Sequence, residues 1–214
     1  MISRRLALAG ALALTAGVFA PKGLRRAVAK PTQAPTPTQP AGPFYPQAIP
    51  TEHDPDLVKV AGEYQALGQV VHLEGTVRTV DGAAVPKAWV EIWQCDANGV
   101  YHHVGDRQGG AEDHGFQGYG AALTNAFGLY QFRTIHPMPY PGRTPHIHVM
   151  VSAPGVRRLV TQLYVAGLES NARDFLFSRL DPEQQARLLV EFKPAPELQA
   201  GALAGRFDLV VERA

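Results

Sequence analysis

Residues 143–151 read RTPHIHVMV, and in this stretch two histidines, one residue apart, begin an apolar run. The apolar and β-branched residues favour a buried strand. Side chains alternate between the two faces of a strand, so His146 and His148 share one face while Ile147 and Val149 share the other. The stretch therefore predicts a strand with one face toward a core and two imidazoles on the opposite face, near enough to share a metal ion. A hydrogen-bonded histidine pair at a strand edge is the alternative.

Short β-rich runs separated by turn residues lie on both sides of this stretch. They cover residues 68–80, 89–96, 124–135, 146–153, 157–165 and 206–213. This spacing is typical of a mainly β protein, and we expect an antiparallel β-sandwich with long loops and one short helix. The helix is expected from Pro182 to Phe192, with Asp181 as its N-cap. The segment 102–122, rich in Gly and His, is expected to be a long loop.

The first twenty residues, MISRRLALAGALALTAGVFA, have a basic start and an apolar stretch too short to span a membrane. They predict an export signal, and Arg4 with Arg5 partly matches the twin-arginine type; the general secretory route is the alternative. Small residues permit cleavage after Ala20 or after Ala29. The expected organisation is a signal peptide at 1–29, a Pro/Thr-rich linker at 30–41 and a β-sandwich domain at 42–214. The protein is expected to be exported to the periplasm without a stable membrane anchor.

Charge and cysteine content exclude several classes of function. Residues 1–29 hold five basic residues and no acid, so their removal would change the formal charge from +1 to −4. A mildly acidic protein lacks the basic surface that binds nucleic acid or anionic lipid. The single cysteine, Cys95, excludes an intrachain disulfide and a thiolate metal cluster, and we expect it to be a small buried residue near a strand end.

Two tyrosines are candidate partners for the histidine pair. Tyr140 lies between prolines in residues 137–142, PMPYPG, which hold its backbone in place, and Tyr101 follows the strand that carries Trp93. A hard trivalent cation can displace the phenol proton, so two phenolates with two imidazoles would select Fe(III) over Zn(II) or Fe(II).

A competing metal motif is the H-x-E of His72 and Glu74, part of the two-histidine, one-carboxylate triad of Fe(II) oxygenases. Val71 and Leu73 form the apolar face of that strand, so His72 and Glu74 are expected on the solvent side. Two further alternatives are a periplasmic zinc or copper binder, and a non-catalytic exported sandwich resembling transthyretin-like or carbohydrate-associated modules. The first would use the four histidines His102, His103, His146 and His148.

Three segments together carry a resemblance to a known family. The run TNAFGLYQFRTIHPMPYPGRTPHIHVMVSAPGVRRLVTQLY, together with VPKAWVEIWQCDANGVY and AGPFYP, resembles the intradiol ring-cleavage dioxygenases, closest to the catalytic subunit type of protocatechuate 3,4-dioxygenase. The resemblance covers about residues 40–213. It implies a β-sandwich core, in agreement with the strand pattern.

The same resemblance implies a function and a set of site residues. Fe(III) would be the cofactor, and a catechol would be cleaved by O2 between its two hydroxyls to give a cis,cis-muconate. Tyr140 would leave the metal and take a substrate proton, Arg143 would stabilise negative charge on the ring, and Gln162 would hydrogen-bond the same region. Gly42 and Pro43 would border the substrate pocket, and a homo-oligomer is expected. The implied metal ligands are Tyr101, Tyr140, His146 and His148.

Overall fold

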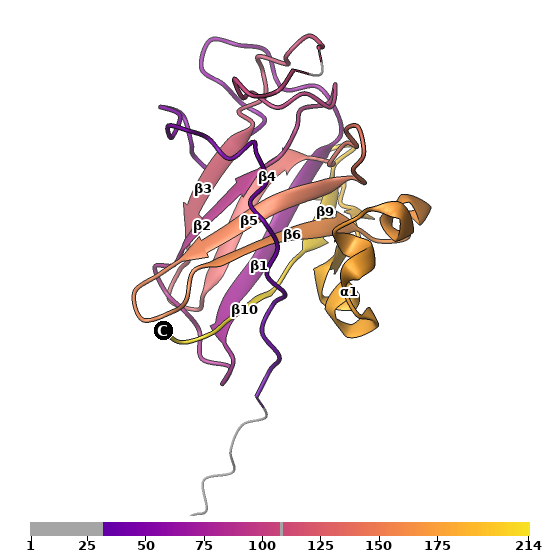
Figure 1. Cartoon of the computed structure of the whole chain (residues 1–214). Helices are drawn as coiled ribbons and strands as arrows, with labels where there is room; N and C mark the ends of the chain where they lie inside the picture. The colour runs from indigo at the N-terminus through magenta and orange to yellow at the C-terminus, as the bar shows by residue number, and fades with distance from the viewer. Residues whose placement is uncertain (1–31, 108) are drawn as a thin grey trace, which may run out of the picture.

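Two five-stranded sheets packed face to face make up the computed structural model, which describes residues 32–107 and 109–214 (Figure 1). The expected export signal lies outside these residues. The expectation of a mainly β sandwich is confirmed. No helix in the described part of the chain has the length and apolar character needed to cross a membrane.

The first sheet is built around the longest strand, β1, which pairs with β4, β9 and β10, while β8 pairs with β9. Its strands are β1 (Val70–Thr79), β4 (Leu129–Ile135), β8 (Lys193–Pro194), β9 (Leu203–Arg206) and β10 (Leu209–Val211). The second sheet has the order β3-β2-β5-β6-β7. Its strands are β2 (Trp89–Trp93), β3 (Tyr119–Leu123), β5 (His146–Ser152), β6 (Leu159–Val165) and β7 (Leu189–Val190).

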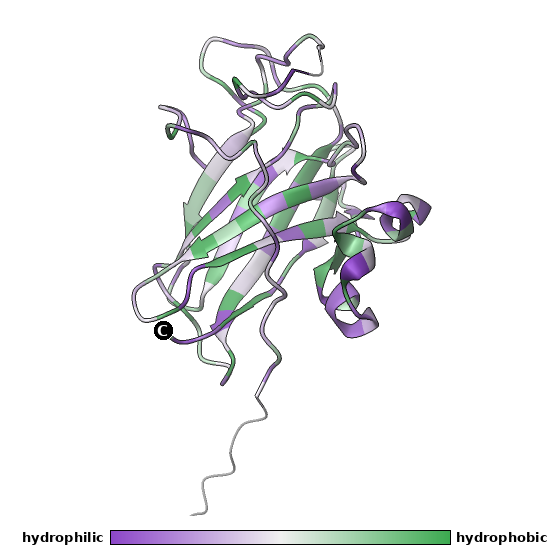
Figure 2. Cartoon of the chain, in the orientation of Figure 1, coloured by the Kyte–Doolittle hydropathy of each residue, from purple (hydrophilic) through white to green (hydrophobic). Residues whose placement is uncertain are grey.

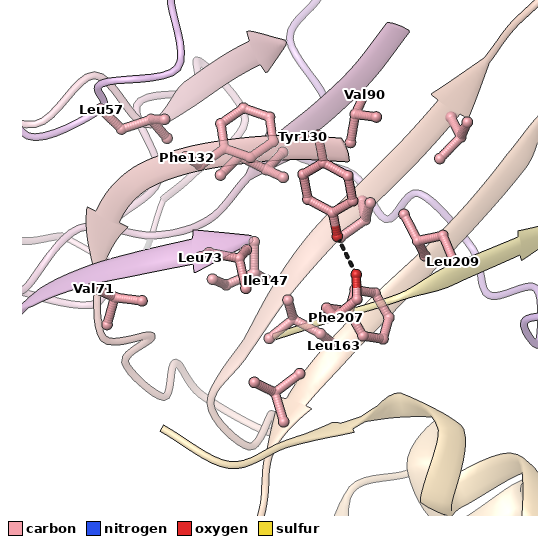
Figure 3. Close-up of a cluster of buried hydrophobic side chains, with 14 of the residues drawn as sticks. Leu57, Val71, Leu73, Val90, Tyr130, Phe132, Ile147, Leu163, Phe207 and Leu209 are labelled. Atoms are coloured by element: carbon pink, nitrogen blue, oxygen red, sulfur yellow. Dashed lines mark hydrogen bonds between the residues drawn. The ribbon is translucent and has the colours of Figure 1, made fainter. Parts of the chain in front are cut away.

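The apolar core lies between the sheets and follows the alternation in the sequence. Val71 and Leu73 of β1 meet Ile147 and Val149 of β5 in one buried cluster, and each is at most 1% exposed. Figure 2 shows green, hydrophobic segments along the strands of both sheets. The buried Tyr130 side chain passes over Gly75 of β1 within the first sheet, and its hydroxyl donates to the Phe207 carbonyl at 2.5 Å (Figure 3). The fold therefore rests on ordinary sandwich packing.

Both sheets contain parallel pairs, which the expectation of an antiparallel sandwich did not include. β9 and β10 run parallel to β1, and β7 runs parallel to β6. Hairpins force antiparallel pairing, but the chain after β6 passes through a long connection that contains two 3-10 turns, Glu169–Arg173 and Phe177–Arg179, and the helix. That connection allows the C-terminal strands to return in either direction.

The single α-helix of the described residues, α1 (Pro182–Leu188), begins where the sequence predicts and ends earlier. The Asp181 carboxylate accepts from the backbone N–H of Gln184 at 2.8 Å, and the side-chain oxygen of Gln184 accepts from the backbone N–H of Asp181 at 3.1 Å. This is a capping box. The expected end at Phe192 is wrong, because Leu189 and Val190 leave the helix to form β7 beside β6.

The expected loop at 102–122 is also shorter than predicted, since β3 begins at Tyr119. Gly120 and its alanine neighbours gave no strand signal. The structure requires a small residue there, because a Cβ at Gly120 would collide with the Leu57 side chain. Cys95 is buried just beyond the end of β2, as expected, with its Sγ 3.4 Å from the Met138 carbonyl oxygen.

The segment expected to be a linker is attached to the sandwich in its described part. We call residues 32–46 the N-terminal arm; this arm is the indigo segment that crosses β5 and β6 in Figure 1. Its backbone N–H groups at Gln33, Thr36 and Gln39 donate to the carbonyls of Val80, Val210 and Val160, respectively. The residues between the prolines keep the backbone N–H groups that make these contacts, so residues 33–39 are bound to the sandwich, where a free linker was expected.

Candidate metal centre

The four residues predicted to hold a metal meet on the face of the second sheet that points away from the core. His146 and His148 come from β5, and their Nε2 atoms lie 3.2 Å apart. Tyr101 follows β2, and Tyr140 lies in the loop between β4 and β5. The Tyr101 ring centroid is 5.4 Å from that of Tyr140, and the Tyr140 centroid is 5.4 Å from that of His146. We call these four residues the Tyr/His cluster.

Both imidazoles present Nε2 to the centre of the cluster. His146 Nδ1 lies 2.6 Å from the Thr144 carbonyl oxygen, and since a carbonyl only accepts, Nδ1 carries the proton and Nε2 keeps its lone pair. The His148 ring stacks on Trp93 with centroids 4.9 Å apart and planes 5° apart. Burial lowers the pKa of His146 to about 3 and holds the pKa of His148 well below its usual range. Both rings are therefore neutral and available as ligands.

Tyr101 has a buried hydroxyl with no hydrogen-bond partner. The side chain is 3% exposed, and its ring stacks on Phe44 of the N-terminal arm with centroids 4.5 Å apart. Burial, and then the neighbouring Tyr140, raise the pKa of Tyr101 well above its usual value. An unsatisfied buried hydroxyl costs about 1–3 kcal/mol, so its position inside the cluster requires an explanation.

Tyr140 is only half buried and lies under the Arg143 guanidinium. Arg143 Nη1 donates to the Tyr140 hydroxyl at 3.2 Å and lies 3.4 Å from His146 Nε2. Burial raises the pKa of Tyr140, while the guanidinium acts in the opposite direction. Of the two tyrosines, Tyr140 is the one with both solvent access and a cationic neighbour.

A buried carboxylate that the sequence did not reveal fixes Arg143. Arg143 Nε donates to Asp174 Oδ2 at 2.8 Å, and the two side chains are 7% and 0% exposed. Asp174 also accepts from the backbone N–H groups of Thr144, Leu176 and Phe177. Burial opposes ionisation of Asp174, but these donors outweigh it and lower its pKa. The guanidinium is thus a permanent, oriented cation beside the cluster.

Gln162 lies beside the cluster as predicted, yet both ends of its amide already have partners. Its Oε1 accepts from Arg143 Nη2 at 2.6 Å, and its Nε2 donates to the Pro40 carbonyl at 3.2 Å. On β6 it is directly opposite His148 of β5. The observed contacts make Gln162 a hydrogen-bond partner that orients Arg143; its expected bond to substrate stays a prediction.

Gly42 and Pro43 are exposed residues of the N-terminal arm at the edge of the cluster. Gly42 has a positive φ of 74°, and a Cβ there would lie 3.3 Å from His148 Cε1. A glycine thus lets the arm pass close to a histidine of the cluster.

The donor set fits ferric iron. Two nitrogen ligands about 2.0–2.1 Å from one ion, at an angle a little above 90°, are about 3.2 Å apart, the observed Nε2 separation. Phenol oxygens with imidazoles form a hard donor set that suits Fe(III). A metal at this point would also provide the Tyr101 hydroxyl with the partner that it lacks.

The alternative metal sites receive no geometric support. Across residues 32–107 and 109–214, no three His, Cys, Asp or Glu side chains gather to hold a metal. His102 lies beside Asp96, with Nε2 3.4 Å from Oδ2, and His103 Nδ1 accepts from the Gly105 N–H. His72 and Glu74 are on the solvent side of β1, as expected, where Glu74 accepts from Arg206.

Sequence reasoning missed Asp174 and two residues near Gln162, namely Tyr164 and Gln39. The alternation of β6 contained a signal for Tyr164, which shares a face with Gln162 and lies opposite His146. Asp174 and Gln39 lie in irregular segments, where no periodic pattern indicates the direction in which a side chain points.

Comparisons with known proteins agree with this geometry. A family model described as Dioxygenase matches residues 41–213. The protocatechuate 3,4-dioxygenase beta chain of Burkholderia cepacia is 34% identical over 167 residues, which cover 74% of this chain and 71% of that protein. The hydroxyquinol 1,2-dioxygenase of Corynebacterium glutamicum is 38% identical over 120 residues, which cover 48% of this chain and 38% of that protein.

One similar solved structure is the dioxygenase domain of a dioxygenase and carbohydrate-binding protein fusion from Streptomyces sp. SirexAA-E. It is 32% identical, has a TM-score of 0.66, and the match covers 85% of this chain and all of that domain. The matches to the hydroxyquinol 1,2-dioxygenases span less than half the length of those relatives.

Proposed function

This chain belongs to the intradiol ring-cleavage dioxygenases, and from that premise we propose that it uses Fe(III) to cleave a catechol-type ring between its two hydroxyls. O2 is the second substrate and a cis,cis-muconate the product. The observation that carries this proposal is the convergence of two neutral imidazole Nε2 atoms, 3.2 Å apart, with the partnerless Tyr101 hydroxyl. A non-catalytic sandwich module has no use for such a cluster.

The proposed ligands are Tyr101, Tyr140, His146 and His148. Bound ferric iron would act as a Lewis acid that draws electron density from a catecholate held by both its oxygens. Tyr101 is the buried phenol and stays in place. Tyr140 is half exposed, so once a bound metal has displaced its phenol proton, its Oη is the one that can turn toward the substrate and accept a hydroxyl proton.

Arg143 provides the fixed positive charge of the site. Its Nη1 points at Tyr140 and His146, whereas Nε and Nη2 are held by Asp174 and Gln162. We assign Nη1 to stabilise negative charge that builds on the ring during cleavage. The aromatic rings of Phe44 and Trp93 stack on Tyr101 and His148, respectively, and hold these two rings in place.

The proposal names the class of substrate, a catechol, and does not select one member of that class. Similar proteins are named for protocatechuate, hydroxyquinol and catechol, and these names support a dihydroxylated aromatic substrate without selecting one. Export to the periplasm and assembly as a homo-oligomer complete the proposal; the basic and apolar start of the sequence supports the first.

The test is oxygen uptake by the iron-loaded protein with catechol, protocatechuate and hydroxyquinol, together with identification of the products. Muconates are expected, and the protein should show a visible absorption band from phenolate-to-Fe(III) charge transfer. A colourless protein after iron loading, or yellow semialdehyde products, would contradict the proposal.

A further inference from the structure

The N-terminal arm is attached to β6 at the point where that strand lacks a neighbour. β7 pairs only with Tyr164 and Val165, so the earlier part of β6 is open on this side. There the Gln39 N–H donates to the Val160 carbonyl at 2.8 Å, and the Thr161 hydroxyl donates to the Pro37 carbonyl at 2.7 Å. The backbone on either side of Gln39 is therefore held in register with the strand that carries Gln162.

The Gln39 side chain is buried and contacts a tyrosine beside Arg143. Gln39 is 7% exposed, and its Oε1 lies 2.6 Å from the Tyr164 hydroxyl. That hydroxyl is also 3.1 Å from Gln162 Oε1 and 3.5 Å from Arg143 Nη2. A phenol has a single proton, and the shortest contact directs it to Gln39. The Tyr164 oxygen is then an acceptor toward the guanidinium.

The neighbouring arm residue, Pro40, orients the Gln162 amide. The Pro40 carbonyl accepts from Gln162 Nε2, so the acceptor end of the amide faces Arg143 Nη2 at 2.6 Å. Gln162 Oε1 thus has two candidate donors, Arg143 and Tyr164, and the Gln39 acceptor removes the second of them from competition.

We propose that Gln39 is a positioning residue for ring cleavage, because it holds the Tyr164 proton away from Gln162 Oε1 and reserves that oxygen for Arg143. The inference rests on the proposed function, in which the guanidinium of Arg143 faces the substrate. The arm that follows the expected export signal is then part of the catalytic apparatus.

The decisive variant is Gln39→Met, which keeps the length of the side chain but has no strong acceptor. The Tyr164 proton then turns to Gln162 Oε1, which must accept from two donors at once, so its bond to Arg143 Nη2 lengthens and the guanidinium is held firmly only by Asp174. We expect kcat for catechol cleavage to fall about 10-fold to 100-fold, with a smaller change in KM. Gln39→Glu restores an acceptor and should recover most of the lost kcat.

The matched control is Gln33→Met in the same arm. Gln33 is exposed, and its backbone N–H, which the substitution keeps, donates to the Val80 carbonyl. This variant should therefore keep the wild-type kcat. The visible absorption band of the iron-loaded Gln33→Met variant should equal that of the wild type, because Gln33 contacts neither the Tyr/His cluster nor Arg143. The band of Gln39→Met should shift slightly, because Arg143 contacts Tyr140 and His146.

Crystal structures of the wild type, Gln39→Met and Gln33→Met provide a readout that does not need activity. We expect the distance from Arg143 Nη2 to Gln162 Oε1 to lengthen only in Gln39→Met. Unchanged Arg143 geometry and kcat in that variant, or an equal loss of kcat in Gln39→Met and Gln39→Glu, would overturn the inference. A wild-type protein that cleaves no catechol would overturn the proposed function instead, and the crystal structures would still decide whether Gln39 positions Arg143.

Discussion

At the site, the two faces of the sheet are equally buried but differ in chemistry. The alternating residues of β5 and β6 named below are 0–1% exposed on both faces. The inner face presents Ile147, Val149 and Leu163, and the outer face presents His146, His148 and Gln162. The inner face gains stability from every contact, whereas the outer face keeps polar atoms without partners, such as the Tyr101 hydroxyl. Burial alone therefore does not distinguish a core from a site; hydrogen-bond satisfaction does.

The largest effect is expected when the hydroxyl oxygen of Tyr101 is removed from the outer face. Tyr101→Phe should lower ring cleavage by more than about 100-fold, because a metal ligand is lost. The metal-free variant should be as stable as the wild type or up to about 3 kcal/mol more stable, because the partnerless hydroxyl is gone. Steady-state kinetics and urea unfolding measure the two quantities. A clear loss of stability in the metal-free variant would mean that the hydroxyl contributes to the fold.

Ile147→Ala is the complementary change on the inner face. The residue is fully buried in the core, so truncation should lower the free energy of unfolding by about 2–5 kcal/mol. The visible band and kcat of the folded, iron-loaded variant should remain near wild type. Thermal unfolding and activity at low temperature check both. A changed absorption band would show that the two faces of β5 are mechanically coupled.

Asp174→Asn should affect both stability and activity, because it leaves Arg143 as a buried cation without its carboxylate. We expect kcat to fall by about tenfold or more and stability at neutral pH to fall by on the order of 3 kcal/mol. The pKa of Asp174 is lower in the folded protein than its unfolded value of about 3.9. The stabilisation of the folded state by ionised Asp174 is therefore complete above the unfolded pKa and is lost as the pH falls through the folded pKa.

Urea unfolding of the wild type and Asp174→Asn from pH 7 to pH 2 measures this dependence. The stability difference should be constant from pH 7 to about pH 5 and shrink below pH 4. A difference that does not change with pH would indicate that lost packing, and not charge, explains the variant.

The smallest effect is expected at the contact between the arm and the cluster. Gly42→Ala places a Cβ at a positive φ and 3.3 Å from His148 Cε1. The backbone conformation should cost about 1–2 kcal/mol, and the contact should shift the absorption band slightly by moving the His148 ring. Gly62→Ala also has a positive φ but meets no atom within 4 Å, so it should have the backbone cost without the spectral shift. Equal spectra for the two variants would show that Gly42 does not influence the cluster.

Local pattern was sufficient for part of the site and for six strands, namely β1, β2, β4, β5, β6 and β10. The alternation of side chains along β5 correctly placed His146 and His148 on one face and Ile147 in the core. The start of α1 was predicted from Asp181 as the N-cap and Pro182 as the first helical residue. The same reasoning failed where contacts between distant segments decide the outcome. It missed β3, extended α1 too far and read the arm as a linker, because the partners of those segments are far away in the sequence.

The sequence by itself determined the class of fold, the family and the four residue types of the proposed metal centre, since strand periodicity and motif order are local properties of the chain. Only the tertiary structure decided how Arg143 is held. Asp174, Gln162 and Gln39 reach it from a loop, a strand and the N-terminal arm, and each contact depends on where long connections bring backbone segments together. A hydrogen bond is sensitive to fractions of an ångström and to direction, and sequence spacing specifies neither across such separations.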